Sequence, residues 1–232
     1  ALAAGMYFDG LRLQRLVKIG GYKLSIQAVL RVIFSNYFMA MLTPGASGGA
    51  VAQVLVLKSY GVPISKGTPI VLIRTVFSIM FLVIMLPLVF LRDAIEIPYI
   101  SRDMLLLFAV LAVIATLLGT YILQTKYMRQ FVYNLAQRFK AHKTKDWLSK
   151  LETLNQGLGL LYKEPIQSII VFFESGLSLL CLYCIAPALM YAFTPDIPII
   201  DILDRMILLN LILYFAPTPG GTGIAEGLFV VL

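Results

Sequence analysis

The sequence has few charged residues and few of the side chains that build common active sites. Only 13% of its 232 residues are Asp, Glu, Lys or Arg, and it contains one histidine and two cysteines. Soluble domains are about a quarter charged, so an ordinary soluble domain is excluded. Cys181 and Cys184 lie in apolar sequence with no second pair or nearby histidine, so we expect helix packing and no metal site. No phosphate-binding loop is present, so we expect neither ATP hydrolysis nor a cofactor.

We also expect no secretory signal in the given residues, because the first six carry no basic side chain. The chain has no initiator methionine and stops inside an apolar stretch. We therefore expect it to be a portion of a longer protein. What is abundant is apolar: 59% of the residues are hydrophobic and the mean hydropathy is +0.87. Composition predicts an all-α polytopic membrane protein.

Basic loops set the predicted topology. Residues 11–26 and 126–163 are rich in Lys and Arg, so both should be cytoplasmic, and the net charge of +7 does not indicate a nucleic-acid partner. We expect several passes through the cell membrane. The segment 126–163 has two amphipathic stripes, which favour either helices on the cytoplasmic membrane surface or an ordinary pair of cytosolic helices.

A Thr-Pro-Gly motif interrupts two of the apolar regions. The first is Thr43–Gly49, within the uncharged run 32–57, and the second is Thr218–Gly223, within the apolar region 206–232. Broken helices survive in a membrane only where protein or a polar cavity surrounds them, and paired breaks in two halves of a chain indicate a transporter site. The sequence predicts a half-helix starting at each Thr-Pro, with free N–H groups that attract phosphate or carboxylate. The alternative is that the glycines only permit tight helix packing.

The requirement that both basic loops lie on the cytoplasmic side predicts how the first interrupted region is arranged. The spans 75–91 and 104–125 together return the chain to the side that it left, so region 32–57 makes no net crossing. We therefore expect a re-entrant hairpin that enters from the cytoplasm. The span 166–194 then leads outward, and the second interrupted region should enter from the opposite face. The predicted fold is an all-α membrane protein with two re-entrant broken-helix hairpins in an inverted-repeat arrangement.

The candidate site consists of the two breaks and the polar residues around them. The basic and acidic candidates carry charge inside apolar sequence, where ionisable side chains are functional by default. Arg31 and Arg74 lie near the predicted ends of their spans, so the alternative to a functional role is that their side chains snorkel to the membrane surface. For Glu226 the alternative is a structural role in which it hydrogen-bonds a neighbouring helix. The head-group-binding candidates are Thr43, Gly45, Ser47, Gly48, Gly49, Gln53, Thr218, Gly220, Gly221, Thr222, Gly223 and Glu226. Secondary candidates are Asn36, Arg31, Arg74, Glu174 and Asn210.

These motifs resemble one known family. Leu42–Gly49 with Gln53, and the more specific string Pro217–Gly227, are similar to the transmembrane region of lysylphosphatidylglycerol synthases and their stand-alone flippase-like relatives. The similarity extends over most of the chain. One departure is that Ala50 and Val51 follow the first Gly-Gly, where many relatives carry a polar or acidic residue.

The resemblance implies a protein that moves a phospholipid, such as aminoacylated phosphatidylglycerol, between leaflets. One alternative is the membrane half of an aminoacyl-phosphatidylglycerol synthase whose soluble catalytic domain is elsewhere; another is a scaffold without transport. No catalytic residue is expected in this chain. The expected partners are membrane phospholipid and the bilayer, with a synthase domain or a second copy as further candidates. The expected parts are a first membrane half (1–125), the basic segment (126–163) and a second membrane half (164–232).

Overall fold

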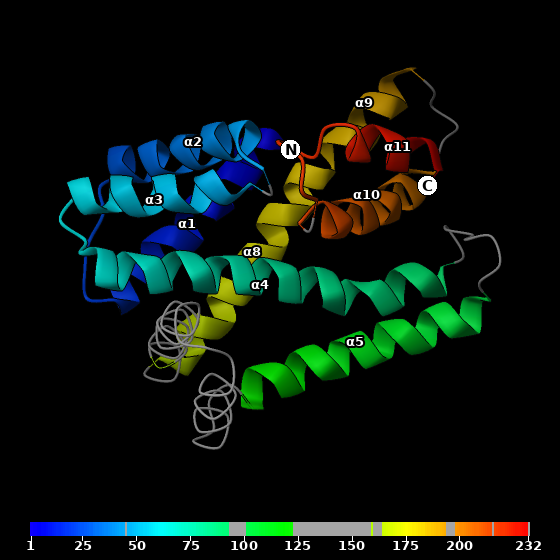
Figure 1. Cartoon of the computed structure of the whole chain (residues 1–232), viewed down its shortest axis with the longest axis horizontal. Coiled ribbons are helices and arrows are strands. Elements are labelled where there is room, and N and C mark those ends of the chain that lie inside the picture. Colours follow the sequence, from blue (N-terminus) through cyan, green and yellow to red (C-terminus); the bar gives the residue numbers. More distant parts are fainter. Residues whose placement is uncertain are drawn as a thin grey trace, which may run out of the picture.

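The computed structural model describes residues 1–44, 46–92, 101–122, 159, 164–193, 198–214 and 216–231, and these are almost entirely helical (Figure 1). The predicted all-α class is confirmed. Within the described residues the strand geometry is limited to one isolated bridge. The helices are α1 Leu2–Ile19, α2 Ile26–Leu42, α3 Ser47–Ser59, α4 Ile64–Leu91, α5 Arg102–Ile122, α8 Pro165–Tyr183, α9 Ile185–Phe193, α10 Ile199–Leu213 and α11 Ile224–Val231.

The first interrupted region forms a hairpin of two helices, α2 and α3, which lie side by side (Figure 1). Ser25 caps α2 by accepting a hydrogen bond from the Ala28 N–H at 3.3 Å. The helix ends at Leu42 because Thr43 precedes a proline and is extended, with φ −116° and ψ 145°. Ala46 then adopts a left-handed conformation, with φ 52°, and α3 begins.

The predicted helix starts at Thr-Pro are wrong. Thr43 is the C-cap of α2, and α3 begins four residues later, at Ser47. The second helix after a Thr-Pro, α11, begins at Ile224, six residues after Thr218. Residues with left-handed backbone conformation lie between each Thr-Pro and the next helix, so the helix begins several residues later than predicted.

The N-terminal part also differs from the prediction. Residues 11–26 were expected to be a basic loop, but α1 continues to Ile19 and places Arg12 and Arg15 within a helix. Helix α4 begins at Ile64, although the predicted span started at Thr75. Arg74 marked that boundary because it is charged, but its side chain is buried and has partners, so the helix continues through it.

Two apolar helices are long enough to cross a membrane by length and composition within the described residues: α4, and α8 together with α9. They cross near the middle of the molecule, and α5 runs alongside α4 (Figure 1). The predicted span 166–194 corresponds to α8 and α9, with a break at Cys184. One buried apolar cluster joins α1, α2, α3, α4 and α8, and a second joins α4, α5, α8 and α10. Many large apolar side chains on α2, α5 and α8 are exposed, as expected for helices in lipid.

Candidate functional site

The two Thr-Pro-Gly motifs meet in the structure. Pro44 of the first motif and Pro219 of the second form an isolated antiparallel bridge. A Cβ at Gly220 would lie 3.4 Å from the Met41 carbonyl oxygen, so the second motif passes close to the end of α2. The loop before α11 lies against that end of the hairpin in Figure 1. Pro44 and Pro219, which are 175 positions apart in the chain, are therefore neighbours in the structure.

The first motif, or first tip (Thr43–Gly49), has its polar groups paired. The Thr43 hydroxyl donates to the Met39 carbonyl and accepts from the Gly48 N–H, both at 2.8 Å, which ties the end of α2 to the first turn of α3. Ser47 Oγ donates to the Pro44 carbonyl at 2.9 Å. A Cβ at Gly48 would lie 2.5 Å from Thr43 Cγ2, so glycine permits this approach. Gly45 lies outside the described residues.

The second motif, or second tip (Thr218–Gly223), is built from glycines with positive φ. Gly220, Gly221 and Gly223 have φ of 61°, 74° and 81°. The Thr222 hydroxyl donates to the Pro219 carbonyl. Thr218 Oγ1, the counterpart of the paired Thr43 hydroxyl, is buried and has no hydrogen-bond partner among the described residues. The second tip therefore holds a buried hydroxyl that no described residue pairs.

Glu226 caps the helix that follows the second tip. Its carboxylate accepts a hydrogen bond from the Gly223 N–H at 2.6 Å, three residues earlier, and its side chain is exposed. This is the return half of a capping box, in which the third helical residue reaches back to the N-cap N–H. The structure therefore gives Glu226 a local role in holding the start of α11 beside the tip.

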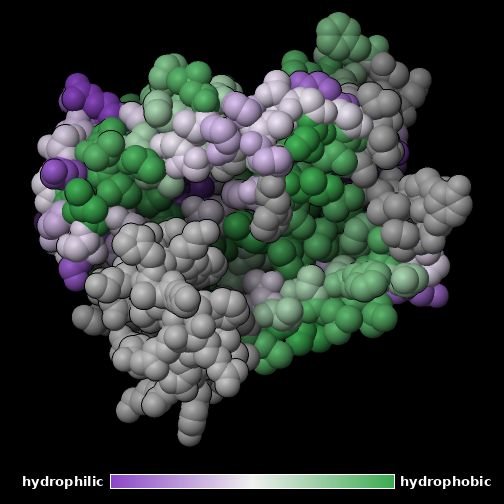
Figure 2. Space-filling model, in the orientation of Figure 1, coloured by the Kyte–Doolittle hydropathy of each residue, from purple (hydrophilic) through white to green (hydrophobic). Residues whose placement is uncertain are grey.

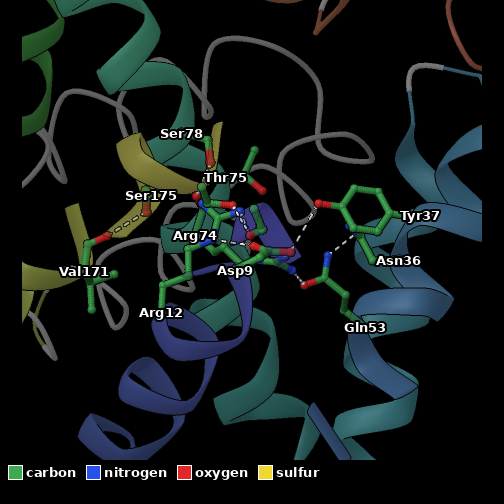
Figure 3. A network of polar contacts seen from close by, with 12 residues as sticks. Asp9, Arg12, Asn36, Tyr37, Gln53, Arg74, Thr75, Ser78, Val171 and Ser175 are labelled. Atoms are coloured by element: carbon green, nitrogen blue, oxygen red, sulfur yellow. Dashed lines mark hydrogen bonds and ion pairs between the residues drawn. The ribbon is translucent and has the colours of Figure 1, made fainter. Parts of the chain in front are cut away.

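Behind the first tip lies a buried polar network (Figure 3). Asp9 of α1 is fully buried, and its carboxylate binds Arg12 at 2.6 Å and Arg74 of α4. Arg74 also donates to Gln53 of α3, and Gln53 donates to Asn36 of α2 at 2.6 Å. The network therefore connects four helices and ends at the hairpin.

Two further contacts complete the network around Asp9. Arg12 Nη1 donates to Ser78 Oγ at 2.8 Å, and the Tyr37 hydroxyl donates to Asp9 at 3.4 Å. Two buried arginines face one buried aspartate, so this group carries a net positive charge, and Arg74 Nε has no partner among the described residues. Buried charges are tolerated only where such hydrogen bonds satisfy them.

Asp9 and Arg12 were missed from the sequence. The signal that could have found them is their spacing, because residues three apart lie on one face of a helix. The four basic residues from Arg12 to Lys23 favour a loop after residue 10, and in a loop this spacing has no meaning. Arg74, Gln53 and Asn36 were predicted as site residues, and the structure joins them in one chain of hydrogen bonds.

Comparison with known proteins identifies the family. A family model described as the lysylphosphatidylglycerol synthase TM region matches residues 1–232, the whole chain. The chain belongs to this family. No curated protein and no solved structure matches it. The resemblance of the two motifs is thereby confirmed, and the family's description, together with the apolar helices α4 and α8–α9, indicates a membrane protein.

Two other candidates, Glu174 and Asn210, have their hydrogen-bond partners outside the two tips. Glu174 of α8 is bound by Arg15 of α1, with Arg15 Nη2 2.7 Å from Glu174 Oε1, and Arg15 also donates to Gln167 at 2.7 Å. The Asn210 side chain donates to the Met206 carbonyl one turn earlier in α10, at 2.8 Å. Asn210 thus differs from Asn36, although the two stand at similar distances before their motifs.

Arg31 lies at the other end of the hairpin from the tip. Thr43 follows it by twelve positions, which corresponds to about 18 Å along a helix. It is exposed and donates to the Tyr60 hydroxyl at 2.7 Å. The structure therefore places Arg31 away from the first tip, for which it was a secondary candidate. The predicted basic segment 126–163, except Gly159, lies outside the described residues.

Proposed function

We propose that this chain is a lipid translocase in which a phospholipid head group passes between the two tips. The observation that carries the proposal is the pairing of Pro44 with Pro219, because it puts both broken-helix motifs at one place. Transporter sites are found where two interrupted helices from different halves of a chain meet. The cell membrane is the proposed location, and membrane phospholipid, including aminoacylated phosphatidylglycerol, is the proposed substrate class.

The chemistry of the tips supports a polar, anionic guest. Helix α3 begins beside the paired prolines, and because the N–H groups of Ser47, Gly48 and Gly49 are paired within the first tip, it offers an anion the positive end of its dipole and no free N–H. The unpartnered Thr218 hydroxyl offers one more polar contact. Gly223 of the second tip has no heavy atom within 4 Å of its Cβ position, so a head group could approach its backbone closely. The acyl chains would stay in the surrounding lipid while the head group moves.

Helix length supports a re-entrant first hairpin. Seventeen residues make α2 about 25 Å long, and thirteen make α3 about 20 Å, whereas the hydrocarbon core is about 30 Å thick. Both helices are therefore short for a crossing. We propose that the first tip ends inside the membrane, that the second tip enters from the opposite face, and that the two hairpins form an inverted pair.

Cysteine labelling tests this topology. Lys23 precedes α2 and Lys58 lies near the end of α3, and both are exposed. Single cysteines at these two positions should react with a membrane-impermeant maleimide from the same side of sealed vesicles. Reaction from opposite sides would show that the α2–α3 region crosses the membrane, and the re-entrant arrangement would be wrong.

A leaflet assay tests translocation itself. The protein is reconstituted in vesicles with fluorescent phosphatidylglycerol, and the share of probe protected from an external quencher is followed over time. Gly220→Leu should slow translocation strongly, because its side chain would meet the Met41 backbone and separate the tips.

The matched control is Gly61→Leu. Gly61 also has a positive φ, of 87°, but it has no heavy atom within 4 Å of its Cβ position and lies in the loop before α4. This variant carries the same backbone strain away from the tips and should translocate lipid normally. Equal rates for the two variants and the unmodified protein would overturn the proposal.

A second candidate function rests on the family's description. As the TM region of a lysylphosphatidylglycerol synthase, the chain would present lipid to a soluble catalytic domain. The length of the full gene separates the two candidates, because a soluble domain that transfers lysine to phosphatidylglycerol would favour the second. In that case the leaflet assay on this chain alone would show no translocation.

A further inference from the structure

The base of the α2–α3 hairpin, at the end away from the first tip, is fixed by apolar packing. Val29, Val32 and Ile33 of α2 and Leu57 of α3 belong to the buried cluster that joins α1, α2, α3, α4 and α8, and each is at most 5% exposed. The base lies toward the hydrophilic edge of the molecule, where purple side chains gather in Figure 2. Burial of these aliphatic side chains therefore holds the base in place.

The tip half of the hairpin, defined as residues 34–42 and 47–56, is held differently. Among these residues the only buried side chain is that of Gln53, which is 5% exposed. Large apolar side chains of this half are not packed on the described protein, since Met41 and Val51 are 72% and 59% exposed. The apolar side chains that touch the buried cluster are only partly buried, namely Tyr37, Ala50, Val54 and Val56. The tip half therefore depends more on polar contacts than the base does.

The polar contacts of the tip half join neutral groups of the hairpin to charged groups of α1 and α4 (Figure 3). The charged groups pair with one another, because Asp9 binds both Arg12 and Arg74. On the hairpin side, Gln53 Oε1 accepts a hydrogen bond from Arg74 Nη1, and the Tyr37 hydroxyl donates to Asp9 at 3.4 Å. If the tip half moves away from α1 and α4, these hydrogen bonds break, whereas both ion pairs remain.

We propose that the tip half of the hairpin is a gate, which Gln53 holds closed through its hydrogen bond to Arg74. In the closed arrangement Pro44 lies against Pro219, as it does in the structure. In the open arrangement the bond between Gln53 and Arg74 is broken, and the tip half tilts about the packed base, away from the second tip. The inference rests on the proposed function, because separation of the two tips would open the passage between them.

The charge of the buried network predicts opposite effects for two substitutions of Gln53. Gln53→Leu removes the acceptor for Arg74, so the ratio of open to closed molecules should rise roughly tenfold, which is the contribution of a hydrogen bond to a charged group. Gln53→Glu places a carboxylate in a network of two arginines and one aspartate, so it should favour the closed arrangement. The Asn36 amide has both a donor and an acceptor, so it can rotate to donate to this carboxylate.

Distances between spin labels, measured by pulsed electron paramagnetic resonance on the full chain in lipid vesicles, test the gate. The labels are attached at Val51→Cys in the tip half and Leu88→Cys in α4, which are both exposed, after the native Cys181 and Cys184 are replaced by serine. The unmodified protein and Gln53→Glu should give one main distance. Gln53→Leu should add a second distance, and the share of the second relative to the first should be roughly tenfold higher than in the unmodified protein.

Two controls separate the gate from a general loss of structure. Gln14→Leu removes an amide of α1 that donates to the Leu24 carbonyl at 3.5 Å, and it should leave the distances unchanged. A second label pair, Ile26→Cys with Leu88→Cys, reports on the base of the hairpin, because Ile26 is the first residue of α2 and is 73% exposed. Its distance should stay the same in every variant.

Three results would overturn the gate. They are an unchanged distance distribution in Gln53→Leu, a second distance in Gln53→Glu equal to that in Gln53→Leu, and movement of the Ile26 label together with the Val51 label. The leaflet assay reports separately on passage, and there Gln53→Glu should slow translocation about tenfold because the gate opens less often. Tip movement in Gln53→Leu with unchanged translocation in Gln53→Glu would support the gate and overturn the proposed passage between the tips.

Discussion

The two tips share a sequence motif but differ in what holds them. The first tip has its hydroxyls paired, and Asn36 and Gln53 connect its hairpin to the buried ion pairs of Asp9. The second tip is a run of left-handed glycines with an unpartnered Thr218 hydroxyl, and an exposed carboxylate caps its helix. The first tip is therefore connected to the buried network, whereas the second tip contacts the first through Pro219 and Pro44.

Because of this difference, substitutions near the two tips should differ in how much they change the free energy of unfolding and how much they change transport. A change near the buried network removes partners from charges that cannot reach water, so it should cost much stability. A change in the second tip affects local conformation and an exposed cap, so it should cost little stability. If translocation depends on both tips, changes in the second tip will affect transport out of proportion to their effect on unfolding.

The largest loss is expected for Asp9→Ala. The substitution leaves Arg12 and Arg74 buried without their carboxylate, which should cost roughly 3–5 kcal/mol in the free energy of unfolding. Denaturant unfolding of the purified protein in detergent measures it. Asp204→Ala is the matched control, because its partner Arg92 is half exposed and can turn to solvent. Equal losses in the two variants would mean that the network does not anchor the first tip.

A smaller loss is expected for Gly49→Ala in the first hairpin. The new Cβ would lie 2.6 Å from Asn36 Oδ1 and 2.9 Å from the Asn36 carbonyl oxygen, so α2 and α3 must separate. Overpacking of this kind costs about 1–3 kcal/mol. The same unfolding measurement applies, and Gly67→Ala, whose nearest neighbours lie at 3.8 Å, is the control. A loss no greater than that of the control would contradict the close packing at Asn36.

In the second tip, Gly223→Ala should cost about 1 kcal/mol, because an alanine with positive φ is strained. Gly223 has φ 81° and no atom within 4 Å of its Cβ position, so the strain is not increased by a clash. Translocation in the leaflet assay should fall more than this stability loss suggests. A normal rate with the expected loss of stability would remove Gly223 from the site.

The smallest stability effect is expected for Glu226→Gln. Glutamine also serves in a capping box, so the free energy of unfolding should change by less than about 0.5 kcal/mol. Translocation should decrease if the negative charge beside the tip acts on the head group. A normal rate in Glu226→Gln together with a reduced rate in Glu226→Ala would assign this residue to capping alone.

The motifs could be predicted from the sequence because they are local. A proline followed by glycines favours the end of a helix and a left-handed turn, so both breaks were found, whereas Pro69, which follows Thr68 without such glycines, lies inside α4. The helix starts were misplaced because the turns use several residues before the next helix. Arg74 was expected near a helix end because an isolated charge in an apolar run is costly. That cost is removed by Asp9, which is 65 residues away in the chain.

The sequence by itself determined the helical class, the two breaks and the membrane character, because composition, proline and glycine act over a few neighbouring residues. Only the tertiary structure decided which charges were paired, since Arg15–Glu174 and Arg74–Asp9 join residues far apart in the chain. It also brought Pro44 against Pro219 and put Arg31 at the opposite end of the hairpin. The physical reason is that a buried charge takes whichever partner packing brings within hydrogen-bonding distance.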